Sequence, residues 1–206
     1  MNLNYNYWYF KNAFSPEQCD RIIKMGMQKD FEYGEVNRNQ TEGIKDYSEE
    51  EKKELFVTRN SHISWMNEAW IYNLLKKYID AANSSAGWNF EWDWTEMLQF
   101  TKYDVGQFYD WHPDQHHYVY PDDDTNENMR GKYRKLSTTL LLNDPSEFKG
   151  GELEFHFNRK ETKVAEELST RGTLVVFPAF VYHRVREVTE GTRYSLVSWS
   201  IGAPFR

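Results

Sequence analysis

Cysteine, positive charge and long apolar runs are all scarce in this sequence, and each scarcity excludes a class of protein. A single cysteine, Cys19, cannot form an internal disulfide and is expected of a protein in a reducing compartment such as the cytoplasm. A formal net charge of −7 argues against nucleic acid as the main partner, because a phosphate backbone is bound by a basic surface. No apolar run approaches the length of a membrane span, and the first residues lack the pattern of a secretory signal.

Aromatic residues, in contrast, are plentiful, at 17% of the sequence. A chain of 206 residues is long enough to bury a core without disulfides, so we expect one domain over residues 1–206. Its interior should be rich in Trp, Tyr and Phe.

Two helices are predicted in the first 90 residues. Ser15-Pro16-Glu17-Gln18 has the pattern of a capping box with proline in the first turn, which predicts a helix from 16 to about 29. Apolar and aromatic residues at helical spacing predict a second helix over 64–82. Residues 32–60 are polar, with a charged run at 48–54, and are expected to be irregular and solvated.

From residue 91 the apolar pattern changes to the alternation that is typical of strands. The expected strands are 92–103, 135–142, 152–157, 173–177, 181–188 and 193–201. Helices followed by many short antiparallel strands predict an α+β fold, in which residues 1–90 give helical support to a jelly-roll or β-sandwich core over 91–206.

The pair His112-x-Asp114 is the first candidate for chemistry, because residues i and i+2 of a strand-like segment face the same side. Alone the pair is weak evidence, since a chain with six histidines and 32 acidic residues forms about one such pair by chance. A second histidine from a distant strand would complete a triad of two imidazoles and one carboxylate, which leaves open positions on a metal. His183 is the best candidate, because it follows the buried-strand pattern that ends at Phe177-Pro178 and precedes the alternating run 185–188.

Arg193 opens the last predicted strand and shares one face with Ser195, Val197 and Trp199. A guanidinium on an inward face is costly unless it meets an anion. A dicarboxylate bound to the metal would supply that anion through its far end, in the bidentate geometry that arginine favours.

The stretch around the His-x-Asp pair resembles the metal-binding strand of the prolyl 4-hydroxylase-like 2-oxoglutarate/iron(II) dioxygenases. Its motif is Tyr103-x-x-Gly106-x-x-Tyr109-x-x-His112-x-Asp114. Further family features follow in the same order and spacing: Arg134-Lys135-Leu136-Ser137, Asn143, Gly150-Gly151-Glu152-Leu153, Phe177-Pro178 and His183-x-Val185-x-x-Val188-x-x-Gly191-x-Arg193-x-Ser195. The resemblance covers about residues 94–201 and implies a double-stranded β-helix (jelly roll) core backed by N-terminal helices.

The resemblance also implies a function. His112, Asp114 and His183 match the family's iron(II) ligands and catalytic centre, Arg193 its 2-oxoglutarate anchor, and Tyr103 a tyrosine lining the co-substrate pocket. The implied reaction hydroxylates a C–H bond, with a peptidyl proline as the leading substrate, O2 as oxidant, succinate and CO2 as co-products, and ascorbate as reductant. Substrate contacts are assigned to three residues, namely Tyr109, Trp111 and Arg134.

The polar segment 115–133 follows the His-x-Asp pair and should begin at the mouth of the site. One interpretation is a lid that orders over a peptide or protein, with Tyr118 and Tyr120 before its acidic run and Arg130 and Arg134 after it as the clamp. The other is a solvated loop without a role, because long loops in compact domains are either functional or disordered. A small-molecule substrate remains the alternative to a peptide.

Two other functions compete with this hypothesis. A cupin-type metalloenzyme that does not use 2-oxoglutarate would keep the metal triad but has no need of Arg193. A non-catalytic β-sandwich module that binds carbohydrate or peptide would keep the aromatic sheet but has no need of three spaced metal ligands.

Overall fold

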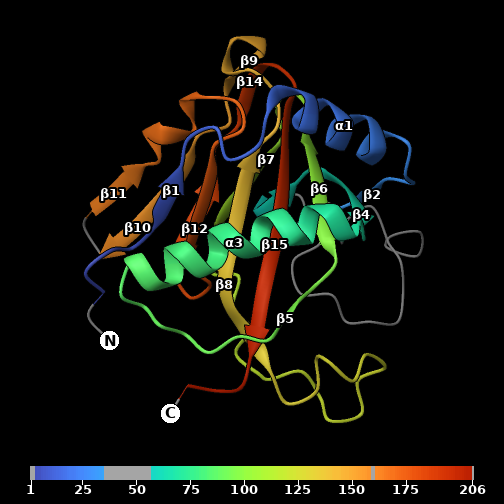
Figure 1. The fold of residues 1–206 in the computed structure, drawn as a ribbon. Coiled ribbons are helices and arrows are strands. Elements are labelled where there is room, and N and C mark those ends of the chain that lie inside the picture. Colours follow the sequence, from blue (N-terminus) through green and yellow to red (C-terminus); the bar gives the residue numbers. More distant parts are fainter. Residues whose placement is uncertain (1–2, 35–56, 159–160, 206) are drawn as a thin grey trace.

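The computed structural model describes residues 3–34, 57–158 and 161–205, and within them two antiparallel sheets pack face to face (Figure 1). The larger sheet runs in the spatial order β1 (Trp8–Phe10), β12 (Leu174–Pro178), β8 (Tyr133–Leu141), β15 (Arg193–Gly202), β6 (Leu98–Tyr103), β4 (His62–Met66) and β2 (Glu32–Tyr33), and β5 (Trp94–Thr95) pairs with β15. The smaller sheet runs in the order β11 (Glu161–Val164), β10 (Leu153–Asn158), β13 (Tyr182–Val185), β7 (Phe108–His112) and β3 (Arg59–Asn60). A separate pair joins β9 (Phe148–Gly150) to β14 (Val188–Gly191).

Two α-helices cover the outer face of the larger sheet, and the longer one, α3, crosses in front of β8 and β15 in Figure 1. Helix α1 (Pro16–Met27) begins with the predicted capping box, in which Ser15 and Gln18 bond to each other's backbone amides. Helix α3 (Ala69–Ser85) begins without a side-chain cap. Cys19 is buried on α1, as expected of a small helix residue, and burial raises the pKa of its thiol to about 11.

The core has two layers, one on each side of the larger sheet. The outer layer packs α1 and α3 against that sheet, through residues such as Ile22, Ile71 and Phe100. The inner layer fills the space between the two sheets, through residues such as Tyr103, Phe155 and Phe177. Side chains that face this inner layer therefore lie inside a β-sandwich whose two walls come from distant parts of the chain.

The α+β jelly-roll architecture and the helix that starts at Pro16 are confirmed. The predicted strand 92–103 is broken at Glu96 into β5 and β6, and the predicted strand 181–188 is divided between β13 and β14. The prediction that a helix begins at residue 64 is wrong. Residues His62–Met66 form β4 instead, because they pair with β6 and the Ser64 hydroxyl donates a hydrogen bond to the carbonyl of Gly26.

Residues 32–60 were expected to be irregular, but short strands lie at both ends of this segment. Strand β2 is an edge strand of the larger sheet, and β3 is an edge strand of the smaller sheet. The charged run at 48–54 lies outside the described residues. Strands β1, β4, β9 and β11 were also not predicted, and three of these have at most four residues, too few to show alternation.

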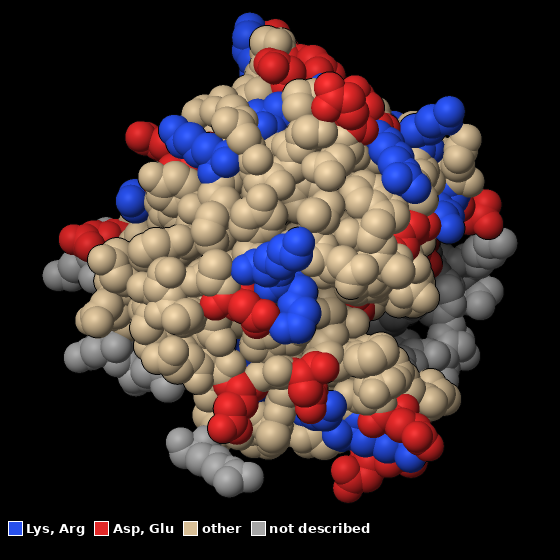
Figure 2. Space-filling model, viewed as in Figure 1, with Lys and Arg blue, Asp and Glu red and all other residues tan. Residues whose placement is uncertain are grey.

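The surface carries charges of both signs in small groups. On the face with α1 and α3, Lys and Arg are interspersed with Asp and Glu, and no continuous basic stripe crosses it (Figure 2). No helix in the described ranges is long and apolar enough to span a membrane.

Helix α1 approaches the sheet so closely that only glycine fits at one position. A Cβ added at Gly26 would lie 2.4–2.6 Å from ring atoms of Phe100, whose side chain is fully buried and cannot move aside. We therefore expect Gly26→Ala to lower the free energy of unfolding by about 1–3 kcal/mol, as overpacking does. Urea denaturation measures the change. Lys24→Ala on the exposed side of α1 is the control and should stay within about 0.5 kcal/mol, and equal stabilities would contradict this close packing.

Candidate metal centre

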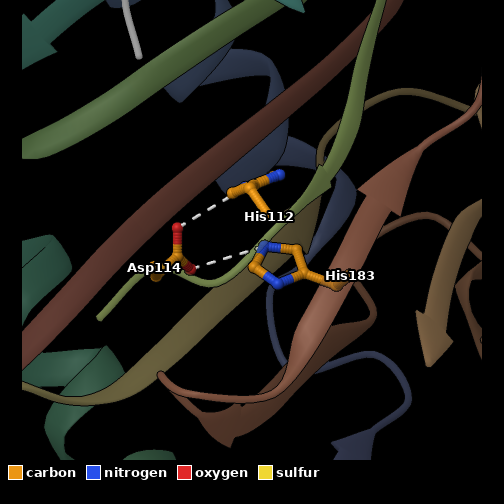
Figure 3. A group of neighbouring side chains, drawn as sticks. All are labelled: His112, Asp114 and His183. Carbon is orange, nitrogen blue, oxygen red and sulfur yellow. Dashed lines mark ion pairs between the residues drawn. The ribbon is translucent and has the colours of Figure 1, made fainter. Parts of the chain in front are cut away.

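Three buried side chains that can bind a metal meet at one end of the inner layer. His112 ends β7 and lies directly opposite His183 in β13, and Asp114 follows His112 by two residues. One ligand atom of each residue lies within 4.8 Å of the others. Figure 3 shows the three side chains pointing toward one another, with ion pairs joining Asp114 to both histidines. The sequence-predicted triad is therefore assembled in space.

Backbone carbonyls fix which ring nitrogen of each histidine faces the carboxylate. Nδ1 of His112 lies 2.6 Å from the carbonyl of Asp110, and Nδ1 of His183 lies 3.0 Å from the carbonyl of Val181. A carbonyl only accepts, so each Nδ1 carries the proton and donates it. The lone pair of each Nε2 then points to the centre, where Asp114 oxygens lie at 3.7 Å from His112 and 3.5 Å from His183.

Asp114 remains ionised although it is buried. Burial on its own would raise the pKa of this carboxyl group, but the neighbouring imidazoles of His183 and His112 and the guanidinium of Arg134 lower the pKa to about 2. Its Oδ2 is buried and has no hydrogen-bond partner among the residues that the structure describes. An anionic oxygen that accepts no hydrogen bond is costly in a protein interior, so the arrangement favours a bound cation.

The two imidazoles are held by aromatic neighbours. The ring of Tyr109 stacks on His112 at a centroid distance of 3.4 Å, and the ring of Phe177 meets His183 edge-on at 4.7 Å. Burial, and then the neighbouring imidazole of His183, lower the pKa of His112 well below its usual value, so this ring is neutral. Burial also raises the pKa of Tyr109 to about 12. Both imidazoles are thus packed between other side chains, and His112 is in the protonation state that a metal would require.

Arg193 lies between the sheets and is 2% exposed. It opens β15, where it pairs with Tyr103 of β6, and its guanidinium lies 5.7 Å from the Tyr103 ring. Nη1 of Arg193 donates to the hydroxyl of Ser195 at 3.1 Å. Gly151 leaves room for the arginine, because a Cβ there would lie 2.7 Å from Cδ of Arg193.

No carboxylate in the described parts of the chain lies within 4 Å of the Arg193 guanidinium. Burial lowers the pKa of this arginine, which shows that its charge is poorly solvated. The charges of Asp114 and Arg193 both act on the hydroxyl of Tyr103, Asp114 raising its pKa and Arg193 lowering it. The two charged residues therefore share one interior. An anion beside Arg193 would therefore relieve an unpaired buried charge.

The three residues expected to contact substrate lie in different places. Tyr109 faces the centre through its stack on His112. Trp111 lies on the opposite face of the smaller sheet, where its ring contacts Arg184 and His156. The guanidinium of Arg134 makes two hydrogen bonds of 2.7 Å to Glu96 and lies 3.8 Å from the Trp199 ring, so its nitrogens face protein groups. These placements favour a substrate contact at Tyr109 and not at Trp111 or Arg134.

Two buried charged residues near the centre were missed from the sequence. Glu96 is the partner of Arg134, and Arg59 lies 4.4 Å from the Tyr109 ring on a short edge strand. An acidic residue within a predicted strand of apolar neighbours was the available signal for Glu96, because such a charge requires a partner. No comparable signal marked Arg59, which lies in a polar stretch.

Comparison with known proteins decides the family. The sequence profile of the 2OG-Fe(II) oxygenase superfamily matches residues 98–201, about half of the chain. The chain belongs to this superfamily. The match covers β6 to β15 and includes His112, Asp114, His183 and Arg193.

Sequence relatives within the superfamily are PKHD-type hydroxylases. One from Psychrobacter sp. (strain PRwf-1) is 37% identical over 100 residues, which are 48% of this chain and 36% of the relative. Another from Picosynechococcus sp. (strain ATCC 27264 / PCC 7002 / PR-6) is 34% identical over 102 residues, 50% of this chain and 40% of the relative. The matched segment is therefore less than half the length of these curated relatives.

Solved structures of similar fold include prolyl hydroxylases. A viral collagen prolyl hydroxylase from Paramecium Bursaria Chlorella virus-1 aligns over 98% of both chains with a TM-score of 0.64 and 20% identity. A prolyl-4-hydroxylase from Pseudomonas putida aligns over 96% of this chain and 93% of its own, with a TM-score of 0.62 and 18% identity. These likenesses confirm the jelly-roll fold of the oxygenase chain.

The residues at the centre fit the iron(II) that the superfamily's name implies. Two imidazoles with free Nε2 lone pairs and one carboxylate are the donor set that binds non-haem iron(II) and leaves positions open. The unpartnered Oδ2 of Asp114 is an independent observation that a cation is expected there.

We expect Asp114→Ala to abolish metal binding, because it removes the only anionic ligand and leaves two neutral imidazoles. The loss of affinity should exceed the about 10- to 100-fold that follows loss of an outer-shell partner. Anaerobic calorimetric titration with iron(II) measures it. Asp110→Ala is the matched control, because its side chain is half exposed and the backbone carbonyl that accepts from His112 remains. Wild-type affinity in Asp114→Ala would disprove the triad.

Proposed function

We propose that this oxygenase binds iron(II) through His112, Asp114 and His183, binds 2-oxoglutarate through Arg193, and hydroxylates a C–H bond of a peptidyl proline. The observation that carries the proposal is that two buried charges both act on the Tyr103 hydroxyl: Asp114, whose Oδ2 has no hydrogen-bond partner in the described residues, and Arg193, with no carboxylate within 4 Å in those residues. Iron(II) with 2-oxoglutarate and O2 supplies the oxidising power, and succinate and CO2 are the co-products. Ascorbate serves as the reductant that maintains iron(II).

The protein's own groups bind, orient and exclude water. The carbonyls of Asp110 and Val181 hold the two imidazoles in the tautomer that faces the metal. Arg193 offers a fork of donors to a carboxylate, with Ser195 and Tyr103 beside it. The apolar side chains Phe155, Phe177 and Leu153 surround this space, which strengthens the charged contacts by excluding water.

A groove at the edge of the site supports a peptide substrate. It has a volume of about 400 Å³ and is lined by aromatic side chains that include Tyr118, Tyr133, Phe180 and Tyr182. Two of its residues are sequence neighbours of the triad, since Pro113 precedes Asp114 and Tyr182 precedes His183, with Tyr182 on the exposed side of β13. Aromatic grooves bind proline-rich segments, whose extended conformation is already formed and costs little entropy.

A solved structure of similar fold also supports a peptide substrate. One solved structure of similar fold is a prolyl hydroxylase from Trichoplax adhaerens in complex with a peptide fragment, at 16% identity and a TM-score of 0.64. We therefore place peptidyl proline ahead of a small molecule as the substrate of this chain.

The domain organisation and location are part of the proposal. Residues 1–206 are taken as one oxygenase domain, with 1–90 as support and 91–206 as the jelly-roll core. The chain's single cysteine is buried, which supports a reducing compartment such as the cytoplasm. Neither nucleic acid nor membrane is a proposed partner.

Arg193 separates this function from that of a metalloenzyme that does not use 2-oxoglutarate. Arg193→Leu should weaken 2-oxoglutarate binding at least about tenfold, the scale of a lost charge-assisted bidentate contact. Metal binding should survive, because Arg193 is not one of the three converging ligands. Calorimetric titration of 2-oxoglutarate into manganese-loaded protein measures the change. Arg193→Lys is the matched variant, and its affinity for 2-oxoglutarate should lie between those of the wild type and Arg193→Leu. An unchanged affinity in Arg193→Leu would favour the cupin-type alternative.

Hydroxylation itself is tested by mass spectrometry. The protein with iron(II), 2-oxoglutarate and ascorbate is incubated with proline-containing peptides and, separately, with free proline. We expect one added oxygen on a peptidyl proline and none with the Asp114→Ala variant. Oxidation of free proline in preference to the peptide would reject the peptide substrate.

The same assay tests the loop 115–133. Its base is closed by hydrogen bonds between Tyr120 and the backbone of Gly131 and Lys132, so residues 122–130 can be replaced by a short Gly/Ser turn. If the loop holds the peptide, hydroxylation falls sharply while succinate formation without peptide continues. Wild-type hydroxylation by the shortened protein would show that the loop is a bystander.

A further inference from the structure

Three buried residues, Glu96, Tyr120 and Arg134, form a hydrogen-bonded group that we call the neck cluster. They come from the turn between β5 and β6, from the loop 115–133 and from the start of β8. The side chains of Glu96 and Arg134 are 9% and 14% exposed, and Tyr120 is 8% exposed. An ion pair held so far from water needs a full set of partners to be stable.

The carboxylate of Glu96 is the hub of the neck cluster. It accepts hydrogen bonds of 2.7 Å from both Nε and Nη2 of Arg134 and one of 2.8 Å from the Tyr120 hydroxyl. Its own backbone is fixed as well, because its amide donates to Trp199 and its carbonyl accepts from the Tyr72 hydroxyl. The hub is thus anchored to β15 and α3.

Arg134 connects the hub to the metal centre. Its Nη1 donates to the backbone carbonyl of Asp114 at 3.4 Å, and its own carbonyl accepts from the Gln115 side chain at 3.0 Å. The chain that leaves Asp114 is therefore tied twice to one arginine, whose planar group is fixed by stacking 3.8 Å from Trp199.

Tyr120 connects the hub to the base of the loop. Its amide donates to the carbonyl of Lys132, and its carbonyl accepts from the amide of Gly131, so the acidic tip 121–130 projects beyond a closed neck. Burial raises the pKa of the Tyr120 hydroxyl, which therefore keeps its proton and donates it to Glu96. No other side chain in the described part of the loop bonds to Glu96.

We propose that the neck cluster is a positioning device that holds the backbone at Asp114 and the base of the loop on one buried carboxylate. The inference rests on the proposed role of Asp114 as a metal ligand. Groups that orient a ligand typically change metal affinity or activity about 10- to 100-fold when they are replaced. Because both ties end on Glu96, replacing Glu96 releases the base of the loop and the backbone at Asp114 together, whereas replacing Tyr120 releases the loop alone.

Two variants separate the ties. Glu96→Gln weakens the whole hub, because an amide cannot accept both arginine bonds with a full charge, and Tyr120→Phe removes only the bond to the loop. Cobalt(II) is the probe, since its visible spectrum reports the arrangement of ligands. We expect Glu96→Gln to bind cobalt about tenfold more weakly with an altered spectrum. Tyr120→Phe should keep the wild-type spectrum, and hydrogen exchange at residues 119–132 should be faster in both variants.

Lys132→Met is the matched control. It removes a 2.7 Å ion pair between Lys132, at the base of the loop, and Asp93, three residues before Glu96. This ion pair does not involve Asp114 or Arg134. Neither the cobalt spectrum nor the exchange of the loop should change. Equal effects of Lys132→Met and Glu96→Gln would overturn the proposal, because any contact at the base of the loop would then have the same effect as the neck cluster.

A further variant covers the case in which Glu96→Gln does not fold. The double replacement Glu96→Leu with Arg134→Met removes both charges together, so no unpaired charge is buried, and such replacements are usually tolerated. It should weaken cobalt binding as Glu96→Gln does, and unchanged cobalt affinity and spectrum in these variants overturn the positioning role alone. Failure of the wild-type protein to bind cobalt would overturn the metal site, and the positioning role with it.

Discussion

An ionised carboxylate kept inside the protein is the constraint on which this site depends. Asp114 is buried with one oxygen that accepts no hydrogen bond from the described residues, and its pKa is nevertheless about 2. The free-energy cost of burying this carboxylate is partly offset by neighbouring positive charge, and a bound cation would offset the rest. Arg193 presents the same constraint with the opposite sign, as a buried guanidinium with no carboxylate within 4 Å in the described ranges. Both charges act on the hydroxyl of Tyr103, which lies in the inner layer between the sheets.

The jelly roll explains how residues so distant in the sequence reach that space. His112 and His183 are 71 positions apart but face each other as partners on adjacent strands, and Arg193 and Tyr103 do the same across the other sheet. Backbone carbonyls beside the histidines orient the rings, so the scaffold determines the tautomer as well as the position. The same overall fold is shared with prolyl hydroxylases at 16–20% identity.

Local signals in the sequence predicted the elements that local chemistry controls. The capping box at Ser15 located the start of α1, and strand alternation located β13 and β15. The motif of the family resemblance located the residues of β7, which lies outside the predicted strands. Long-range pairing could not be read in this way. His62–Met66 has an apolar pattern compatible with a helix, but pairing with β6 makes it a strand, and α3 begins without a side-chain cap that would mark its true start.

The same limit explains the residues around the centre. Arg134 was expected at the substrate because it follows the loop, yet the partner that determines its position, Glu96, lies 38 residues earlier. Trp111 was expected in the cavity because it precedes His112, but successive strand residues face opposite sides, and its ring contacts Arg184 instead. Substrate specificity is similarly beyond what the fold determines, since one fold serves many substrates.

The most direct test of the central claim is an anaerobic titration of 2-oxoglutarate into the iron(II)-loaded protein, followed by visible absorbance. A keto acid that chelates iron(II) gives a charge-transfer band that neither component shows alone. If Asp114, His112 and His183 hold the metal and Arg193 anchors the co-substrate, the band should appear and saturate at one equivalent. A protein that binds iron(II) but gives no band at saturating 2-oxoglutarate would contradict the account.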